Sequence, residues 1–212
     1  MPKLPNAPDL DRLRQLSPSL ASIPAGTVVH RIYRRGGDHP TLWDAFRYFG
    51  PTSARFDHQL RDTDGKSHVQ DRGVIYAATD IVTALAEVFQ QKRTINRELD
   101  QPCLVSAALA CELSLLDLTD TFAVRVGGSM KLASGATLYS QNWSRAFYEC
   151  YPTIHGLYYP SSLSNRPVMA LYERALPLRP FEEAPRFHRA LRDALLLEPL
   201  RNASREIGYD LI

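Results

Sequence analysis

Cysteine is scarce in this sequence, and nothing pairs the few cysteines that it has. Cys103, Cys111 and Cys150 include no Cys-x-x-Cys pair and have no histidine partner at zinc-site spacing. The six histidines never stand four residues apart, which is the spacing of a two-histidine zinc site on a helix. We therefore expect free thiols in a reducing compartment and no metal site.

Long hydrophobic runs are absent as well. No stretch approaches the roughly 20 consecutive apolar residues that a membrane-spanning helix needs. The N-terminal segment MPKLPNAPDLDRLRQLSPSL lacks the continuous apolar stretch of a signal peptide. The sequence therefore predicts a cytoplasmic protein that does not engage a membrane.

The glycine-rich signatures of common nucleotide-binding folds are also missing. There is neither a Rossmann fingerprint nor a P-loop, so any dinucleotide must be bound in another way. No Gly-x-Ser-x-Gly elbow supports a serine hydrolase, because Ser161 and Ser162 follow Pro160 instead. A formal net charge of +2 is too small to indicate direct nucleic-acid binding, and we expect none.

Length and composition are those of one globular domain. The chain has 212 residues, of which 44% are hydrophobic and 23% charged, so it can bury a core without disulfides. Residues 1–26 are expected to form a helical arm and residues 180–212 a helical extension, on either side of a main domain at 27–179. The helix of the extension is predicted from Phe187, Leu191 and Leu195, which stand four residues apart.

The hydrophobic pattern predicts a mixed α+β domain with central strands and flanking helices. Apolar and β-branched runs predict strands at 27–33, 73–78, 103–111, 113–118, 156–159 and 168–172. Helical spacing predicts helices at 81–92 and 140–151, and Thr79 or Asp80 can cap the first of them. The segment 35–73 shows no clear element, and loops of that length are often functional.

A set of polar and aromatic residues is scattered over these elements. It comprises Arg31 and Tyr33 in the first strand, Arg55 in the long loop, Tyr76 in the second strand, Glu87 in the helix after it, and Ser161 beyond a late strand. Taken singly, each has an ordinary structural explanation. Glu87, for example, stands about 160° from the centre of the apolar stripe of its helix, which indicates an exposed surface residue.

The order of these residues along the chain resembles the RES domain, a family named for its Arg, Glu and Ser. The matching segments span residues 27–178 and are 30–33 (HRIY), 54–57 (ARFD), 74–78 (VIYAA), 83–88 (TALAEV), Trp143 and 155–162 (HGLYYPSS). The sequence departs from the family pattern at Ser53-Ala54, which stand where the family usually has two glycines. The stretch between Arg55 and Tyr76 is also longer than usual.

The resemblance implies an ADP-ribosyltransferase-like fold and a catalytic domain at 27–179. It implies a toxin of a bacterial toxin–antitoxin pair that breaks the nicotinamide–ribose bond of NAD⁺. Glu87 would stabilise the positive charge that develops on the ribose during this cleavage. Arg31 and Arg55 would hold the pyrophosphate through charge-assisted hydrogen bonds.

The same resemblance assigns the remaining site residues and the partners. Tyr76 and Tyr33 would stack on the nicotinamide or its ribose. Ser161, with Ser162 as its rival, would hold a ribose hydroxyl or the nicotinamide amide. The reaction would need no metal and no cofactor beyond NAD⁺ as substrate, with phosphate as a candidate co-substrate. The implied protein partner is a cognate helical DNA-binding antitoxin of the Xre-like type.

Several functions remain open at this point. Water as acceptor gives a glycohydrolase, phosphate a phosphorylase, and a protein side chain an ADP-ribosyltransferase, and the residues named above do not separate these. A toxin directed at RNA would use the arginines, which make up 21 of the 25 basic residues, and would bind less tightly as salt rises. A non-catalytic binding module would use the aromatic residues of 35–73 and would not need Glu87.

Overall fold

One mixed β-sheet organises the chain, which the computed structural model describes at residues 9–128, 132 and 135–212. Its strands are β1 (Leu20–Ile23), β2 (Val28–Arg34), β3 (Arg47–Gly50), β4 (His68–Ala78), β6 (Pro102–Ala108), β7 (Leu113–Asp117), β8 (Gly156–Pro160), β9 (Pro167–Tyr172) and β10 (Phe187–Ala190). They run in the order β1-β7-β8-β9-β4-β2-β6-β10, and β3 pairs with β4 beside this row. β7 and β8 are parallel, whereas the other neighbours are antiparallel.

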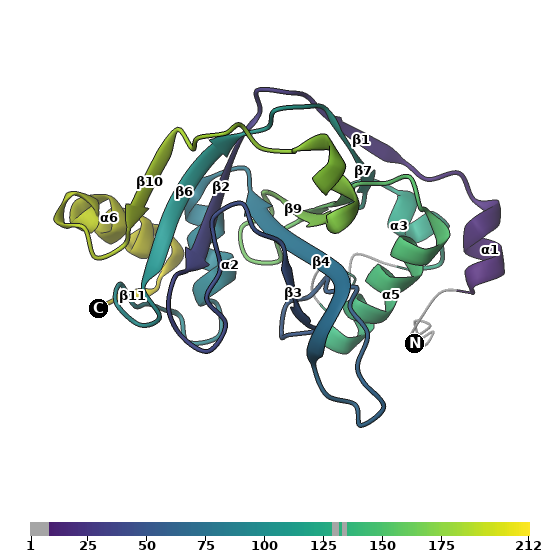
Figure 1. Cartoon of the computed structure of the whole chain (residues 1–212), viewed down its shortest axis with the longest axis horizontal. Helices are drawn as coiled ribbons and strands as arrows, with labels where there is room; N and C mark the ends of the chain where they lie inside the picture. Colours follow the sequence, from purple (N-terminus) through teal and green to yellow (C-terminus); the bar gives the residue numbers. More distant parts are fainter. Residues whose placement is uncertain (1–8, 129–131, 133–134) are drawn as a thin grey trace.

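Helices pack on this sheet and at its ends. They are α1 (Leu10–Gln15), α2 (Ile81–Phe89), α3 (Phe122–Arg125), α5 (Thr137–Cys150) and α6 (Leu197–Ile207), with the 3₁₀ turns η1 (Glu173–Leu178) and η2 (Ala194–Leu196). The larger core joins Ile32 and Val74 of the sheet to Leu85 of α2 and Phe147 of α5, so both helices cover one face. Figure 1 shows α2 behind β2, with α5 and α3 towards the opposite end from α6.

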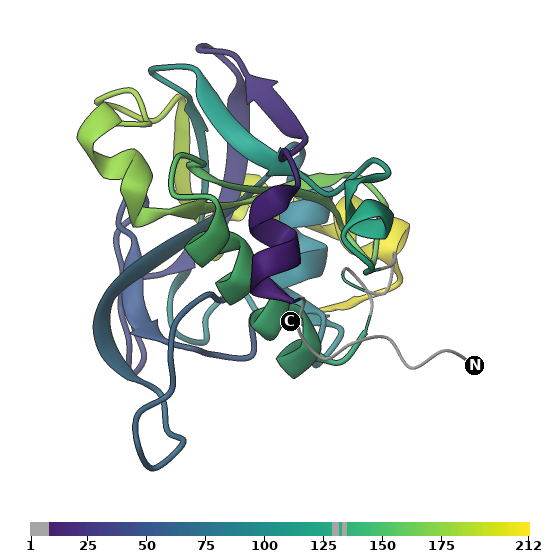
Figure 2. The same cartoon turned by 90° about the vertical axis from the view of Figure 1, so that its right-hand side faces the viewer.

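Smaller contacts complete the fold around this core. A second core on the other face of the sheet joins Ile75 and Leu171 to Ala175 of η1. A two-stranded parallel sheet, β5 (Thr94–Ile95) with β11 (Asp210–Leu211), ties the end of the chain to the segment after α2. α1 lies beside α5 (Figure 2), where the Tyr151 hydroxyl donates to the Leu13 carbonyl over 2.8 Å.

The edge of β4 that faces β2 and β3 is divided between them. At its end, Ala78 pairs with His30 of β2, whereas further back Val74 pairs with Arg47 of β3. Because β2 and β3 pair with successive parts of the same edge of β4, the residues that connect them, 35–46, leave the sheet. The loop between β3 and β4 projects from the body in both views (Figures 1 and 2).

The predicted α+β class, with central strands and flanking helices, is confirmed. The six predicted strands correspond to β2, β4, β6, β7, β8 and β9, and the two predicted internal helices to α2 and α5. Asp80 is the cap of α2, since its carboxylate accepts the Thr83 N–H over 2.9 Å. The three cysteines are free thiols, as expected.

The helix predicted from Phe187, Leu191 and Leu195 is wrong. Phe187–Ala190 form the strand β10, and the C-terminal helix α6 begins only at Leu197. The backbone of β10 pairs with the free edge of β6, and these hydrogen bonds prevail over the helical spacing of three apolar side chains. α6 also contains Pro199, in the first turn, where a helix needs no N–H donor.

Both terminal segments, 1–26 and 180–212, were expected to be helical arms, yet each adds a strand to the main sheet. β1 pairs with β7 and β10 pairs with β6, in each case satisfying a strand edge that would otherwise expose N–H and C=O groups. The boundaries at 26 and 179 therefore do not separate arms from a sheet. The segment 35–73, expected to lack clear elements, contains β3 and the start of β4.

Within the described part of the chain, no helix is both long and apolar enough to span a bilayer.

Candidate active site

Glu87 lies near the C-terminal end of α2 and contacts the loop that follows β8. The Ser161 hydroxyl donates to Glu87 Oε1 over 2.6 Å. The same loop is joined to α2 by Thr83 Oγ1, which lies 2.8 Å from Ser164 Oγ, and Tyr209 donates to the backbone of the helix. Glu87 is therefore half-buried, and the surface position indicated by the helical spacing is wrong, because α2 is covered on more than one side.

The hydroxyl of Ser161 has no free hydrogen-bonding position. Its proton is donated to Glu87, and its oxygen accepts the N–H groups of Leu163 at 3.1 Å and Ser164 at 3.3 Å. Ser161 is 3% exposed, whereas Ser162 is exposed and takes no part in this contact. Of the two candidate serines, Ser161 is thus the one that holds the carboxylate.

Opposing effects set the protonation of Glu87. Burial raises the pKa of this carboxyl, while the hydrogen bond from Ser161, the positive charge of Arg55 and the hydrogen bond from Gln90 lower it. Gln90 Nε2 lies 3.4 Å from Glu87 Oε2. Because Arg55 acts on this carboxyl through its charge, the structure brings Arg55 into the neighbourhood of the Glu87–Ser161 pair.

The backbone that carries Arg55 is held by buried polar side chains of α5. Gln141 donates to the carbonyl just before Arg55 over 3.0 Å, and Ser144 donates to the carbonyl just after it over 2.7 Å. The exposed fractions of Gln141 and Ser144 are 2% and 0%. The Arg55 guanidinium itself donates to the Gly135 carbonyl. α5 thus fixes the position from which Arg55 acts on Glu87.

Tyr76 is joined to a buried carboxylate that the sequence did not indicate. Its hydroxyl donates to Asp57 Oδ1 over 2.8 Å, and Arg47 Nη2 lies 2.6 Å from the same oxygen. Tyr159 connects this group with Glu87: burial raises the pKa of Tyr159, and the negative charges of Glu87 and Asp57 raise it further. The phenol of Tyr159 therefore lies within electrostatic range of both carboxylates.

The guanidinium of Arg31 has no carboxylate within ion-pair distance among the described residues. It donates to the carbonyls of Trp43 at 2.8 Å and Ala45 at 3.3 Å. Burial, and then the like charge of Arg47, lower the pKa of Arg31 to about 10, so it stays positive at neutral pH. The charge of Asp44 opposes this lowering of the pKa. With no carboxylate at ion-pair distance, the desolvated guanidinium still favours an anionic ligand, because buried charge that is not paired is costly.

Tyr33 does not belong to this group. It follows Arg31 on the same face of β2, but its hydroxyl lies 2.6 Å from Nε2 of His188 in β10. Its ring packs with Cys103 and Val105 and is 5% exposed. The structure therefore gives Tyr33 a packing contact between β2 and β10 and does not bring it to Glu87.

Five residues of the site were not indicated by the sequence pattern: Asp57, Arg47, Tyr159, Gln141 and Ser144. Asp57 and Tyr159 stand inside segments that carry the RES resemblance, ARFD and GLYYP, and this was the one signal that could have found them. Within residues 9–128, 132 and 135–212, no group of three or more His, Cys, Asp or Glu side chains could hold a metal ion. The site therefore offers carboxylates, guanidinium groups and phenols.

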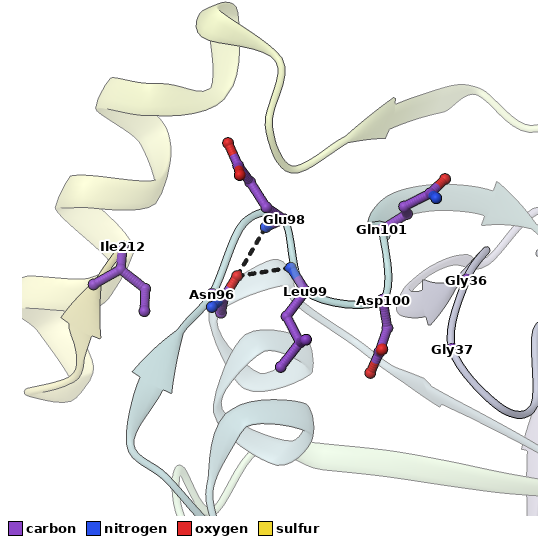
Figure 3. Close-up of a pocket in the computed structure, with 8 residues that line it drawn as sticks. All are labelled: Gly36, Gly37, Asn96, Glu98, Leu99, Asp100, Gln101 and Ile212. Atoms are coloured by element: carbon purple, nitrogen blue, oxygen red, sulfur yellow. Dashed lines mark hydrogen bonds between the residues drawn. The ribbon is translucent and has the colours of Figure 1, made fainter.

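A cavity of about 640 Å³ lies elsewhere, beside the end of the chain. It is lined by the glycine pair after β2, the loop between β5 and β6, and the C-terminal Ile212 (Figure 3). In that loop the Asn96 side chain accepts the N–H groups of Glu98 and Leu99 at 2.9 and 2.8 Å. None of the six site residues predicted from the sequence lines this cavity, so it is not the Glu87–Ser161 site.

Comparison with known proteins agrees with the order of residues read from the sequence. The RES domain family model matches residues 28–192, and the chain therefore belongs to the RES domain family. A chain in the crystal structure of the M. tuberculosis MbcT–MbcA toxin–antitoxin complex is similar, with a TM-score of 0.55 and 14% sequence identity. The similarity covers 93% of this chain and 95% of that chain, and at this identity it shows a shared fold. Curated protein sequences give no match.

Proposed function

We propose that this protein is the toxin of a toxin–antitoxin pair and that it cleaves the nicotinamide–ribose bond of NAD⁺. Membership of the RES domain family supports the proposal, and so does a fold shared with a chain of a toxin–antitoxin complex. The observation that carries it is the 2.6 Å hydrogen bond from Ser161 to the half-buried carboxylate of Glu87, with the charge of Arg55 nearby.

The chemistry of this bond suits a single, well-placed carboxylate. As the C1′–N bond breaks, the pair of bonding electrons leaves with nicotinamide, which departs as a neutral molecule. The ribose is left with oxocarbenium-like positive charge, as in glycoside cleavage. Glu87 would stabilise that charge from a site of low dielectric, where electrostatic interactions are strongest. The leaving group therefore needs no proton and no metal.

Each of the other residues would have a separate task. Ser161 would act as a positioning residue, because its hydroxyl is committed to Glu87 and to two backbone N–H groups. Arg31, a desolvated cation with no carboxylate at ion-pair distance among the described residues, would bind the pyrophosphate, and Arg55 would assist it. Tyr76 would present its ring to the nicotinamide or ribose, where an aromatic face suits a cationic ring.

The acceptor and the partner are part of the proposal. An oxygen of water or phosphate would bond to C1′ of the ribose, with the proton of an attacking water passing to solvent, giving hydrolysis or phosphorolysis of free NAD⁺. A protein side chain as acceptor would make the enzyme an ADP-ribosyltransferase through the same bond cleavage. The partner would be a cognate antitoxin of the helical, DNA-binding, Xre-like type, and the enzyme would deplete cellular NAD⁺ when that partner is lost.

The test is NAD⁺ consumption by the purified, antitoxin-free chain, with and without phosphate. We expect NAD⁺ to disappear with release of nicotinamide, and the Glu87→Gln variant to be slower by about 10²-fold or more. A requirement for phosphate would identify the acceptor. If folded protein leaves NAD⁺ intact in both conditions, cleavage of free NAD⁺ is wrong. Transfer to proteins would then be tested with labelled NAD⁺.

A further inference from the structure

Asp57 is a charged residue with no exposed surface, and every lone-pair position of its carboxylate is used. Its exposed fraction is 0%. Oδ1 accepts from Tyr76 at 2.8 Å and from Arg47 at 2.6 Å. Oδ2 accepts the Thr52 N–H at 2.6 Å and the Thr52 hydroxyl at 2.9 Å. A carboxylate saturated in this way cannot act on a substrate itself, so any effect on the reaction passes through its neighbours.

The first of these neighbours is Tyr76. A carboxylate only accepts hydrogen bonds, so the Tyr76 hydroxyl must donate, and this fixes the position of the hydroxyl end of the ring. Burial and the charge of Asp57 both raise the pKa of Tyr76, so the phenol stays protonated and keeps donating. The hydroxyl is anchored in the interior while the residue as a whole is only partly buried. Asp57 therefore determines where the Tyr76 ring meets the site.

The second neighbour is Arg47, which pairs with Asp57 and lies within electrostatic range of Arg31. Arg47 lies in β3, and its like charge lowers the pKa of Arg31 in β2. Asp57 compensates the charge of Arg47 at 2.6 Å. Among the residues that the structure describes, no carboxylate lies within ion-pair distance of Arg31, and Asp44 acts on it only through its charge. As a result, Arg31 is the cation of this pair that is left for an anionic ligand.

We propose that Asp57 is a positioning residue of this site, which orients Tyr76 and cancels the charge of Arg47 so that Arg31, rather than Arg47, meets the pyrophosphate. This inference rests on the proposed function, in which Tyr76 and Arg31 contact NAD⁺. It assigns to Asp57 an effect on turnover, separate from its contribution to folding.

The isosteric variant Asp57→Asn separates the two roles. Its amide keeps the shape of the side chain but removes the charge and one acceptor, so Tyr76 loses its charged partner and Arg47 its counter-charge. We expect kcat to fall by about tenfold or more, the typical effect of losing a hydrogen bond to a charged group. KM should stay the same or fall, because a second uncompensated cation attracts the anionic substrate. General damage to the fold would instead raise KM or remove active protein.

A double-mutant cycle with Tyr76→Phe tests the coupling. We expect the variant with both changes to be no slower than the slower single variant, since both remove the same interaction, the hydrogen bond of Tyr76 to a charged acceptor. Asp71→Asn, on the exposed part of β4, is the matched control and should keep wild-type kcat and KM. If Asp57→Asn does not fold, the cycle is repeated in an Arg47→Gln background, which restores the charge balance around position 57.

Two readouts keep this inference distinct from the proposed function. One is NAD⁺ turnover, and the other is the inducer concentration that halves growth of cells expressing each variant. Additive losses, or a rise in KM alone, overturn the role of Asp57. If the wild type arrests growth without consuming NAD⁺, the proposed function fails. Non-additive effects of Asp57→Asn and Tyr76→Phe on growth would then still support the positioning role of Asp57. If the wild type does neither, both fail.

Discussion

Removal of one hydroxyl, in the variant Ser161→Ala, tests whether this serine acts through Glu87. The hydroxyl donates to Glu87 Oε1 over 2.6 Å, a short distance typical of a hydrogen bond to a charged acceptor. Its remaining capacity is taken by two backbone N–H groups, so the geometry leaves nothing for a ribose hydroxyl. The substitution therefore removes support for the carboxylate and no direct contact with the substrate.

The size of the effect follows from the strength of such a bond. A hydrogen bond to a charged group contributes about 1.5–3 kcal/mol. If all of it is lost in the transition state, kcat/KM falls by roughly tenfold to 150-fold, at 1.36 kcal/mol for each factor of ten. The hydrogen bond from Ser161 also lowers the pKa of Glu87. Without it that pKa rises further, so the acid side of the pH–rate profile moves to higher pH.

The assay is steady-state NAD⁺ turnover between pH 4 and 9 for wild type, Ser161→Ala and Ser162→Ala. Ser162 is the matched control because it is the exposed neighbour that makes no contact with Glu87, and its variant should behave as wild type. An effect of Ser161 through Glu87 is excluded if Ser161→Ala raises KM alone and leaves the acid limb of the pH–rate profile unchanged. That result would mean that Ser161 binds the substrate directly.

Three further predictions concern charge. Arg31→Lys should raise KM by about tenfold or more with little change in kcat, because an ammonium cannot replace a planar guanidinium fork. Steady-state kinetics measures this, and Arg34→Lys, on the exposed end of β2, is the control. Burial raises the pKa of Glu87 above its ordinary value of 4.5. The contribution of this carboxyl to the free energy of unfolding is therefore fully present below pH 4.5 and is lost as pH rises through the pKa of the folded state. Glu87→Gln should therefore unfold at higher urea than wild type at pH 7 and show no such gain near pH 4; equal midpoints at pH 7 would contradict this. Burial lowers the pKa of His58 below 6.5 despite its hydrogen bond with Glu173. The contribution of His58 to the free energy of unfolding is therefore fully present above pH 6.5 and declines as pH falls through the pKa of the folded state. The difference between the urea midpoints at pH 5 and pH 8 should be smaller for His58→Gln than for wild type.

The parts of the fold that the sequence predicts are those in which several local signals agree. The strand ending at Ala78 and the helix from Ile81 have apolar periodicity, and Asp80 supplies the cap between them. The failure at 187–195 has the opposite cause. Spacing was the only signal there, and the structure is decided by the free edge of β6, which is formed by residues more than 80 positions earlier. Edge pairing of this kind leaves little trace in the sequence of the strand that supplies it.

The sequence indicated part of the candidate site. The order of residues indicated both Glu87 and Ser161, and the structure joins them across 74 positions of chain. The half-buried position of Glu87 could not be predicted from its own helix. It depends on Ser164 and Tyr209, which cover the side of α2 that its apolar stripe leaves open. The contact of Tyr33 has a complementary explanation, since its partner His188 belongs to the strand β10, which was expected to be a helix.

Two features that looked unrelated in the sequence account for each other. The segment 35–73 has few regular elements, and the helix at 140–151 has mostly polar residues between its aromatics. A buried backbone without regular structure must still find partners for its carbonyls. The fully buried Gln141 and Ser144 supply those partners on either side of Arg55. The polar face of α5 is therefore an inward-facing support, and Ser144→Ala should lower turnover through Arg55, although the changed side chain lies outside the set of residues expected to touch NAD⁺.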